Sequence, residues 1–199
     1  MNPIISITIG LSMAVFSTQL FAQESANSSH ASPYAGFETR AIKSLSEADI
    51  EELRRGGGWG LALPAELNGV PGPAHLLELK NEMGLSPEQI AAIEEIFTEM
   101  QAEATMFGEQ LIAAEQAIEE AFVSGNLGDD RLRVLIEDAE TARANLRFVH
   151  LSRHLLTPPL LTEDQIVLYK TLRGYGSDPC TNVPEGHDAD KWRQHNGCE

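Results

Sequence analysis

The sequence predicts an all-α fold, built on a long antiparallel helical hairpin with short flanking helices. Apolar residues recur at steps of three and four over two stretches of roughly thirty residues each. Helix-capping residues precede these stretches, and glycines or prolines follow them. No stretch alternates apolar and polar residues as a half-buried strand does. The length of 199 residues suits one domain with tails.

The first residues predict export. Residues 3–22 are apolar and uncharged, and Leu20 and Ala22 occupy the −3 and −1 positions of a cleavage site. We therefore expect a signal peptide over residues 1–22 and a periplasmic location. An uncleaved membrane anchor is the alternative, although the apolar stretch is short for a span. Residues 23–45 begin with a Ser/Ala/Asn-rich stretch and are expected to form a disordered leader.

Residues 46–72 are expected to hold a short helix and a Gly/Pro-rich segment. Ser46 and Asp49 form a capping pair, and Gly56 ends the helix after Arg54. The high density of glycine and proline that follows argues against a long helix. One helical turn is expected within the run LALPAEL.

Residues 73–173 contain the hairpin. A short helix is predicted from His75 to Met83, and the first long helix from Ser86 to about Val123. The second long helix begins near Asp129 and ends at Thr157-Pro158-Pro159, because proline cannot continue the hydrogen-bond ladder. A last helix runs from Leu161 to Leu172. Two helices with such long apolar stripes leave apolar surface uncovered, which dimerisation usually buries.

Composition excludes several classes of function. The chain has 14 basic and 30 acidic residues, a formal charge of −16, which disfavours binding to nucleic acid or to an anionic membrane. Such a charge suits cations or basic partners. The sequence contains no glycine-rich phosphate loop, no His-Glu-x-x-His and no Gly-x-Ser-x-Gly. We therefore expect a protein that is not an enzyme.

Two capping boxes share one pattern, Leu-Ser/Thr-x-x-Gln, at the heads of two helices that flank the hairpin. Their residues are Leu85, Ser86 and Gln89 in the first, and Leu161, Thr162 and Gln165 in the second. With the predicted export signal and helical body, this arrangement resembles the LTxxQ family, which includes the Spy and CpxP stress proteins and the ZraP and CnrX metal-responsive proteins. The resemblance covers about half of the chain, residues 73–173.

The resemblance implies a cradle-like homodimer that holds unfolded clients, restrains a membrane signalling protein, or binds metal. The first hypothesis is therefore an envelope-stress protein of the Spy/CpxP type. Its candidate client-binding residues are Ile93, Phe97, Met100, Phe107, Leu146 and Val149, with Arg143 and Arg147 at the rim. The alternative interpretation of these charges is an interhelical ladder between the glutamates of the first long helix and the arginines of the second.

The histidines support a second hypothesis, a heavy-metal sensor or scavenger. His150 and His154 are four residues apart and share one side of a helix, a spacing that allows both to ligate one ion. Counting residues from the helix ends places His75 and Glu94 at a similar distance along the helix axes as His150 and His154. These four residues are candidate ligands for Zn, Ni, Co or Cu, with Glu78 in reserve. The alternative is a pair of histidines without metal on an amphipathic helix. A third hypothesis is a structural protein that only dimerises.

The tail, residues 174–199, lacks helical periodicity and contains both cysteines of the chain. In an oxidising compartment Cys180 and Cys198 are expected to form a disulfide. Trp192 and Tyr175 are candidates for the small core that this disulfide would close. A metal site formed with His187 and His195 is the alternative, although its spacing fits no common zinc finger.

Overall fold

The computed structural model describes residues 32–175, 180, 183 and 186–198. The predicted signal peptide and residues 23–31 of the predicted leader lie outside these residues. In the rest of the predicted leader, Ile42 and Leu45 are buried, so this part is not the disordered segment that its composition predicts. Residues 32–35 form a turn, in which the Ala35 amide donates to the Ser32 carbonyl. All regular structure in the described part of the chain is helical, as the sequence predicts. No helix in that part is long and apolar enough to span a membrane.

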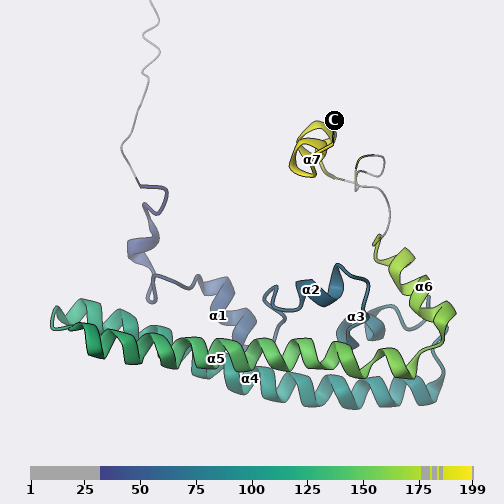
Figure 1. Cartoon of the computed structure of the whole chain (residues 1–199), viewed down its shortest axis with the longest axis horizontal. Coiled ribbons are helices and arrows are strands. Elements are labelled where there is room, and N and C mark those ends of the chain that lie inside the picture. Colours follow the sequence, from purple (N-terminus) through teal and green to yellow (C-terminus); the bar gives the residue numbers. More distant parts are fainter. Residues whose placement is uncertain (1–31, 176–179, 181–182, 184–185, 199) are drawn as a thin grey trace, which may run out of the picture. The chain divides into compact units, whose positions relative to one another are not determined.

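Two long consecutive helices, α4 (Pro87–Ser124) and α5 (Asp129–Leu156), pack along each other (Figure 1). Glu103 pairs with Arg153 and Glu115 with Arg143, so positions further along α4 meet earlier positions of α5. That order is the one expected of antiparallel helices. The two ion pairs also match the predicted ladder between glutamates of one helix and arginines of the other.

Shorter elements precede and follow this helix pair. They are η1 (Phe37–Thr39), α1 (Glu47–Arg54), α2 (Leu63–Glu66), α3 (Pro73–Glu78), η2 (Pro158–Leu160), α6 (Glu163–Leu172) and α7 (Ala189–His195). Helix α3 is shorter than predicted, because turns replace the last helical residues before Gly84. Helix α7 was not predicted; the Asp188 side chain caps it by accepting from the Lys191 amide.

The capping residues at the helix starts act as predicted. Ser46, Ser86 and Thr162 each accept a hydrogen bond from the backbone amide three residues later, and the third residue returns one. The two motif glutamines also meet each other. Gln89 Nε2 donates to Gln165 Oε1 at 2.8 Å, and Gln165 Nε2 donates to Gln89 Oε1 at 3.2 Å. The paired amides therefore fasten the start of α6 to the start of α4.

Two apolar clusters stabilise the helix pair. The larger one joins α1 and the segment before it to α4 and α5, with Leu45, Leu53, Leu111 and Leu146 almost fully buried. Gly108 lets α1 lie directly on α4, because a Cβ there would stand 2.5 Å from the Leu53 carbonyl oxygen. The smaller cluster joins α3, α4 and α6 and comprises Leu76, Met83, Leu85, Ile93 and Tyr169.

The predicted client-binding stripe is therefore buried within one chain. Ile93, Met100, Leu146 and Val149 are at most 6% exposed, and Phe97 and Phe107 are partly buried against the larger cluster. The apolar periodicity predicted that a second copy of the chain would cover this stripe. Helices α1 and α3 of the same chain make these contacts instead. The open apolar face expected from the sequence is thus covered by the chain's own N-terminal segments.

The described part of the tail contains the expected disulfide between Cys180 and Cys198. His187 packs edge-on against Trp192, with ring centroids 5.0 Å apart. Tyr175 differs from the prediction: its hydroxyl donates to Glu66 rather than joining a core with Trp192.

Candidate functional site

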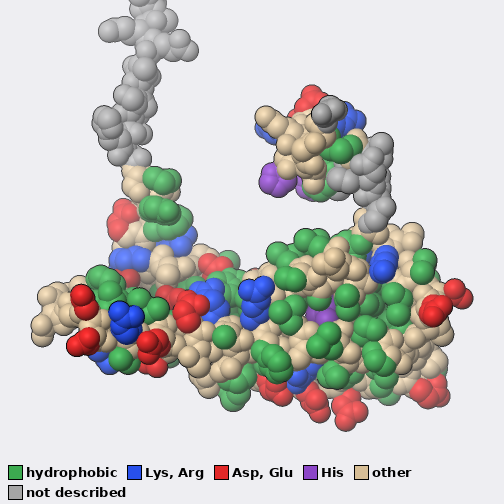
Figure 2. Space-filling model, in the orientation of Figure 1, with side chains coloured by type: hydrophobic (Ala, Val, Ile, Leu, Met, Phe, Trp, Pro, Cys, Tyr) green, Lys and Arg blue, Asp and Glu red, His purple; other side chains and the backbone are tan. Residues whose placement is uncertain are grey.

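A pocket of about 510 Å³ lies where α1–α3, the helix pair and the end of α6 meet. Its lining includes His75 from α3 and His150 and His154 from α5, three of the four predicted metal ligands. Glu94, the fourth, is exposed and does not line the pocket. Glu78, the reserve ligand, does line it. In the space-filling view a histidine shows among hydrophobic side chains near α2, α3 and α6 (Figure 2).

The carboxylate that meets the histidines is Glu66, at the end of the single turn α2. Only 8% of this residue is exposed. Its Oε2 accepts from the hydroxyls of Tyr169 at 2.9 Å and Tyr175 at 3.0 Å, and its Oε1 lies 2.9 Å from His75 Nδ1. The Arg173 guanidinium lies 3.8 Å from Oε2. A buried carboxylate is thus surrounded by donors on both oxygens.

These donors keep Glu66 ionised. Burial opposes the charge, but the hydrogen bonds from His75, Tyr169 and Tyr175 outweigh it and lower the pKa of Glu66 from 4.5 to about 2. Burial and the neighbouring carboxylate in turn raise the pKa values of Tyr169 and Tyr175. Both tyrosines therefore stay protonated and donate.

The proton of His75 can be placed from its partners. Arginine has only donors, so Arg173 Nη2, 3.3 Å away, faces a lone pair on His75 Nε2. The neutral ring then carries its proton on Nδ1 and donates it to Glu66. In many metal sites a carboxylate accepts the proton of one histidine ring nitrogen, and the other ring nitrogen uses its lone pair to bind the metal. His75 and Glu66 have this arrangement.

His154 has the same kind of orientation. Its Nδ1 lies 2.9 Å from the carbonyl oxygen of Val70, which can only accept, so Nδ1 carries the proton of the neutral ring. Its Nε2 faces Glu66 Oε1 at 3.6 Å, beyond hydrogen-bond range. Gly72 permits this approach, because a Cβ there would stand 2.6 Å from His154 Nε2.

His150 is the most isolated of the three. It is 3% exposed, and its Nε2 is buried with no hydrogen-bond partner among the described residues. Burial lowers the pKa of His150, against the opposing effect of a backbone hydrogen bond to Gly57. A buried ring nitrogen without a partner calls for an explanation, and a lone pair reserved for a ligand is one.

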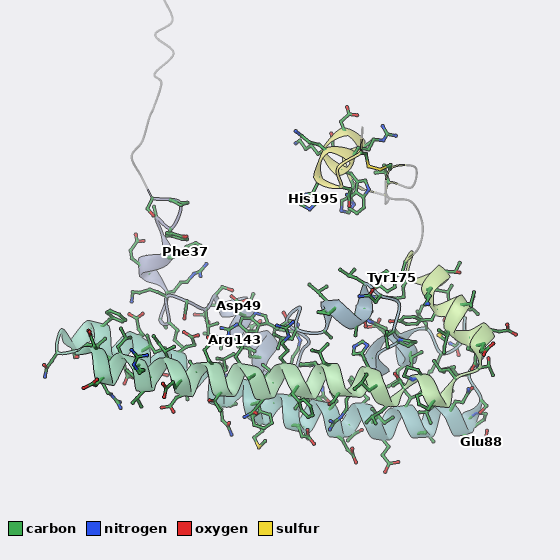
Figure 3. All side chains as sticks on the ribbon, viewed as in Figure 1. Phe37, Asp49, Glu88, Arg143, Tyr175 and His195 are labelled. Atoms are coloured by element: carbon green, nitrogen blue, oxygen red, sulfur yellow. A yellow bond between two sulfur atoms is a disulfide. The ribbon has the colours of Figure 1, made fainter. Side chains whose placement is uncertain are left out.

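The loop between α1 and α2 forms one wall of the pocket. Trp59 has φ = 44°, and no other non-glycine residue in the described ranges has a positive φ. Its backbone amide donates to Glu52 and its indole Nε1 donates to Asp49 at 2.8 Å, while Arg143 lies 4.8 Å above its ring. Figure 3 shows Asp49 and Arg143, the two side chains that contact the Trp59 ring, close to each other. These contacts stabilise a backbone conformation that costs energy in isolation.

The predicted metal ligands are not grouped around one point in the described residues. Among the described residues, no three side chains of His, Cys, Asp or Glu are grouped closely enough to hold an ion. The donor types and ring orientations fit a transition metal. The Nε2 atoms of His75, His150 and His154 would have to come closer to one another to bind a single ion. Sequence reasoning missed Glu66, Tyr169 and Arg173. The only local signal was a glutamate within an otherwise apolar run.

Comparison with known proteins gives no family. No family model matches the chain, and no curated protein and no solved structure is significantly similar to it. The resemblance to the LTxxQ family therefore remains a hypothesis based on the two motifs.

Proposed function

We propose that this chain is a non-enzymatic periplasmic protein of the LTxxQ type that binds a divalent transition-metal ion through the pocket histidines. Its α4–α5 hairpin would connect the metal site to a partner, either a second copy or a membrane signalling protein. One observation carries the proposal. His75, His150 and His154 line a single pocket, and the Nε2 of the buried His150 has no partner among the described residues.

The orientation of the rings supports the same function. His75 donates through Nδ1 to a carboxylate and His154 through Nδ1 to a backbone carbonyl, which leaves both Nε2 lone pairs directed away from those acceptors. Imidazole nitrogens with a nearby carboxylate suit Zn, Ni, Co or Cu. Glu66 is the carboxylate of the pocket and orients His75, whereas the predicted ligand Glu94 is exposed outside the pocket.

The test is a calorimetric titration of residues 23–199 with Zn²⁺, Ni²⁺, Co²⁺ and Cu²⁺. We expect micromolar or tighter binding of at least one ion, and loss of that binding in the double variant His150→Ala/His154→Ala. Glu94→Gln is the matched control, because it removes a carboxylate at similar depth outside the pocket and should leave the affinity unchanged. Binding that survives in the histidine double variant would overturn the proposal.

A second candidate function is the binding of unfolded clients. Apolar side chains remain exposed on α5 and α6, notably Phe148 at 69%, Leu155 at 75% and Val167 at 64%. Phe148 and Leu155 are seven residues apart on α5 and therefore share one face. These residues, rather than the buried stripe, would contact a client. Suppression of client aggregation that is lost in Phe148→Ser/Leu155→Ser, with folding unchanged, would support this function.

A further inference from the structure

Arg173 occupies a place that a metal ion would need. Its Nη2 lies 3.3 Å from His75 Nε2, 3.2 Å from the Tyr175 hydroxyl and 3.8 Å from Glu66 Oε2. The guanidinium thus places a positive charge beside the lone pair of one proposed ligand and beside the buried carboxylate. One lone pair cannot accept from Arg173 and ligate a metal at the same time.

The end of α6 holds Arg173 in this place. The backbone amide of Arg173 donates to the Tyr169 carbonyl, and Gly174 then turns the chain with φ = 72°. The Tyr175 amide closes the turn by donating to the Lys170 carbonyl at 2.8 Å. This turn is a common way to end a helix, and it directs both Arg173 and Tyr175 back toward Glu66. Figure 3 shows Tyr175 where α6 ends.

Tyr175 couples this helix end to the carboxylate. Arg173 donates to the Tyr175 oxygen, and the Tyr175 hydroxyl donates to Glu66 Oε2 at 3.0 Å. Because Glu66 also accepts from His75, the arginine, the tyrosine, the carboxylate and the imidazole form one closed ring of contacts. Removing Arg173 from His75 would therefore also loosen the turn that holds Tyr175.

We propose that Arg173 and Tyr175 form a latch, in which the guanidinium is an internal cationic competitor that must leave His75 Nε2 before a metal ion binds there. The inference rests on the proposed metal-binding function and adds its regulation. It gives a reason why the ligands are not assembled: one of them is engaged by the chain's own guanidinium. Metal binding would free the end of α6 at Arg173 and Tyr175.

The size of the effect follows from competition. If the latch is closed nine-tenths of the time, the apparent affinity for metal is about tenfold weaker than the intrinsic affinity. Arg173→Met keeps the aliphatic length of the side chain but removes the charge and the donors. We therefore expect Arg173→Met to bind Zn²⁺ about tenfold more tightly than the unmodified protein, measured by calorimetry on residues 23–199.

A second measurement tests whether the latch is closed when no metal is present. In the metal-free protein, hydrogen exchange of the Tyr175 amide should be faster in Arg173→Met, because the turn loses its anchor. Zn²⁺ added to the unmodified protein should speed exchange at the same amide. Arg133→Met is the control, because it removes an exposed arginine of α5 outside the pocket and should change neither the affinity nor the exchange.

The outcomes separate the two proposals. Tighter binding and faster exchange in Arg173→Met support the latch, as does binding that occurs only in that variant. If the unmodified protein binds Zn²⁺ and Arg173→Met binds equally or more weakly, the latch is wrong and the metal site stands. If neither protein binds any of the four ions while circular dichroism shows that both are folded, the proposed metal site is wrong. The proposed latch is then wrong as well.

Discussion

The helix pair is stabilised in different ways along its length. Around α1 the contacts are apolar, with Leu53 and Leu146 buried and charges such as Arg54 and Glu109 paired at the surface. Around α2, α3 and α6 the chain has a smaller apolar cluster and also buries an ionised carboxylate, which histidines and tyrosines surround. A buried charged group is a weak source of net stability, since desolvation offsets most of the attraction. The apolar region is therefore expected to supply more of the net stability, and the polar region is where we propose that a metal ion binds.

The largest expected effect comes from removing the centre of the polar region. Glu66→Ala would leave buried hydroxyl and imidazole donors without their acceptor, so we expect a loss on the order of 3–5 kcal/mol in the free energy of unfolding. Urea denaturation measures this loss. Glu94→Ala, at an exposed carboxylate, should change stability by less than about 0.5 kcal/mol. Equal effects of the two variants would remove the distinction between the regions.

The polar region should also dominate the acid sensitivity of the metal-free protein. Because the pKa of Glu66 falls from 4.5 to about 2 on folding, its stabilisation is complete above pH 4.5 and is lost as the pH falls toward 2. The shift corresponds to about 3 kcal/mol. Glu66→Gln, which cannot ionise, should lack this part of the pH dependence in urea unfolding measured from pH 6 to pH 2. Parallel stability curves for the two proteins would contradict the prediction.

Two glycines allow a matched test of close packing in each region. A Cβ at Gly72 would stand 2.5 Å from the His154 ring, and one at Gly108 would stand 2.5 Å from the Leu53 carbonyl oxygen. We expect Gly72→Ala and Gly108→Ala each to cost about 1–3 kcal/mol, part of the loss at Gly108 being offset by helix propensity. Only Gly72→Ala should also weaken metal binding. Equal metal affinities in the two variants would show that the His154 position is unimportant for the site.

The smallest effect is expected at the boundary between the regions. Arg143 pairs with Glu115 at 3.5 Å and lies over Trp59, but its side chain is 35% exposed, so solvent screens the charge. Arg143→Ala should therefore cost about 1 kcal/mol, and Arg147→Ala less than about 0.5 kcal/mol. The difference between the two thermal unfolding midpoints should shrink in high salt. If Arg143→Ala lowered the free energy of unfolding as much as Glu66→Ala, Trp59 and the loop between α1 and α2 would belong to the core of the site.

The sequence by itself determined the features that depend on local rules. Each of these features depends on residues within one or two helical turns of one another. They are the capping at Ser46, Ser86 and Thr162, the apolar stripes of α4 and α5, and the end of α5 before Pro158. The pairing of Cys180 with Cys198 followed because the chain has only two cysteines. Counting helical turns from the two motifs also brought His75, His150 and His154 to the same depth.

Only the tertiary structure decided which groups complete the site and what covers the stripe. The hydrogen bonds of Glu66 to Tyr169 and Tyr175 join residues 103 and 109 positions apart. No periodicity relates a glutamate in a Gly/Pro-rich segment to a tyrosine beyond the second long helix. The covering of the stripe by α1 and α3 likewise depends on close packing at positions such as Gly108. Hydrophobic attraction has no direction, so the stripes predicted that something must cover them, and the shapes of the packed surfaces determined what does.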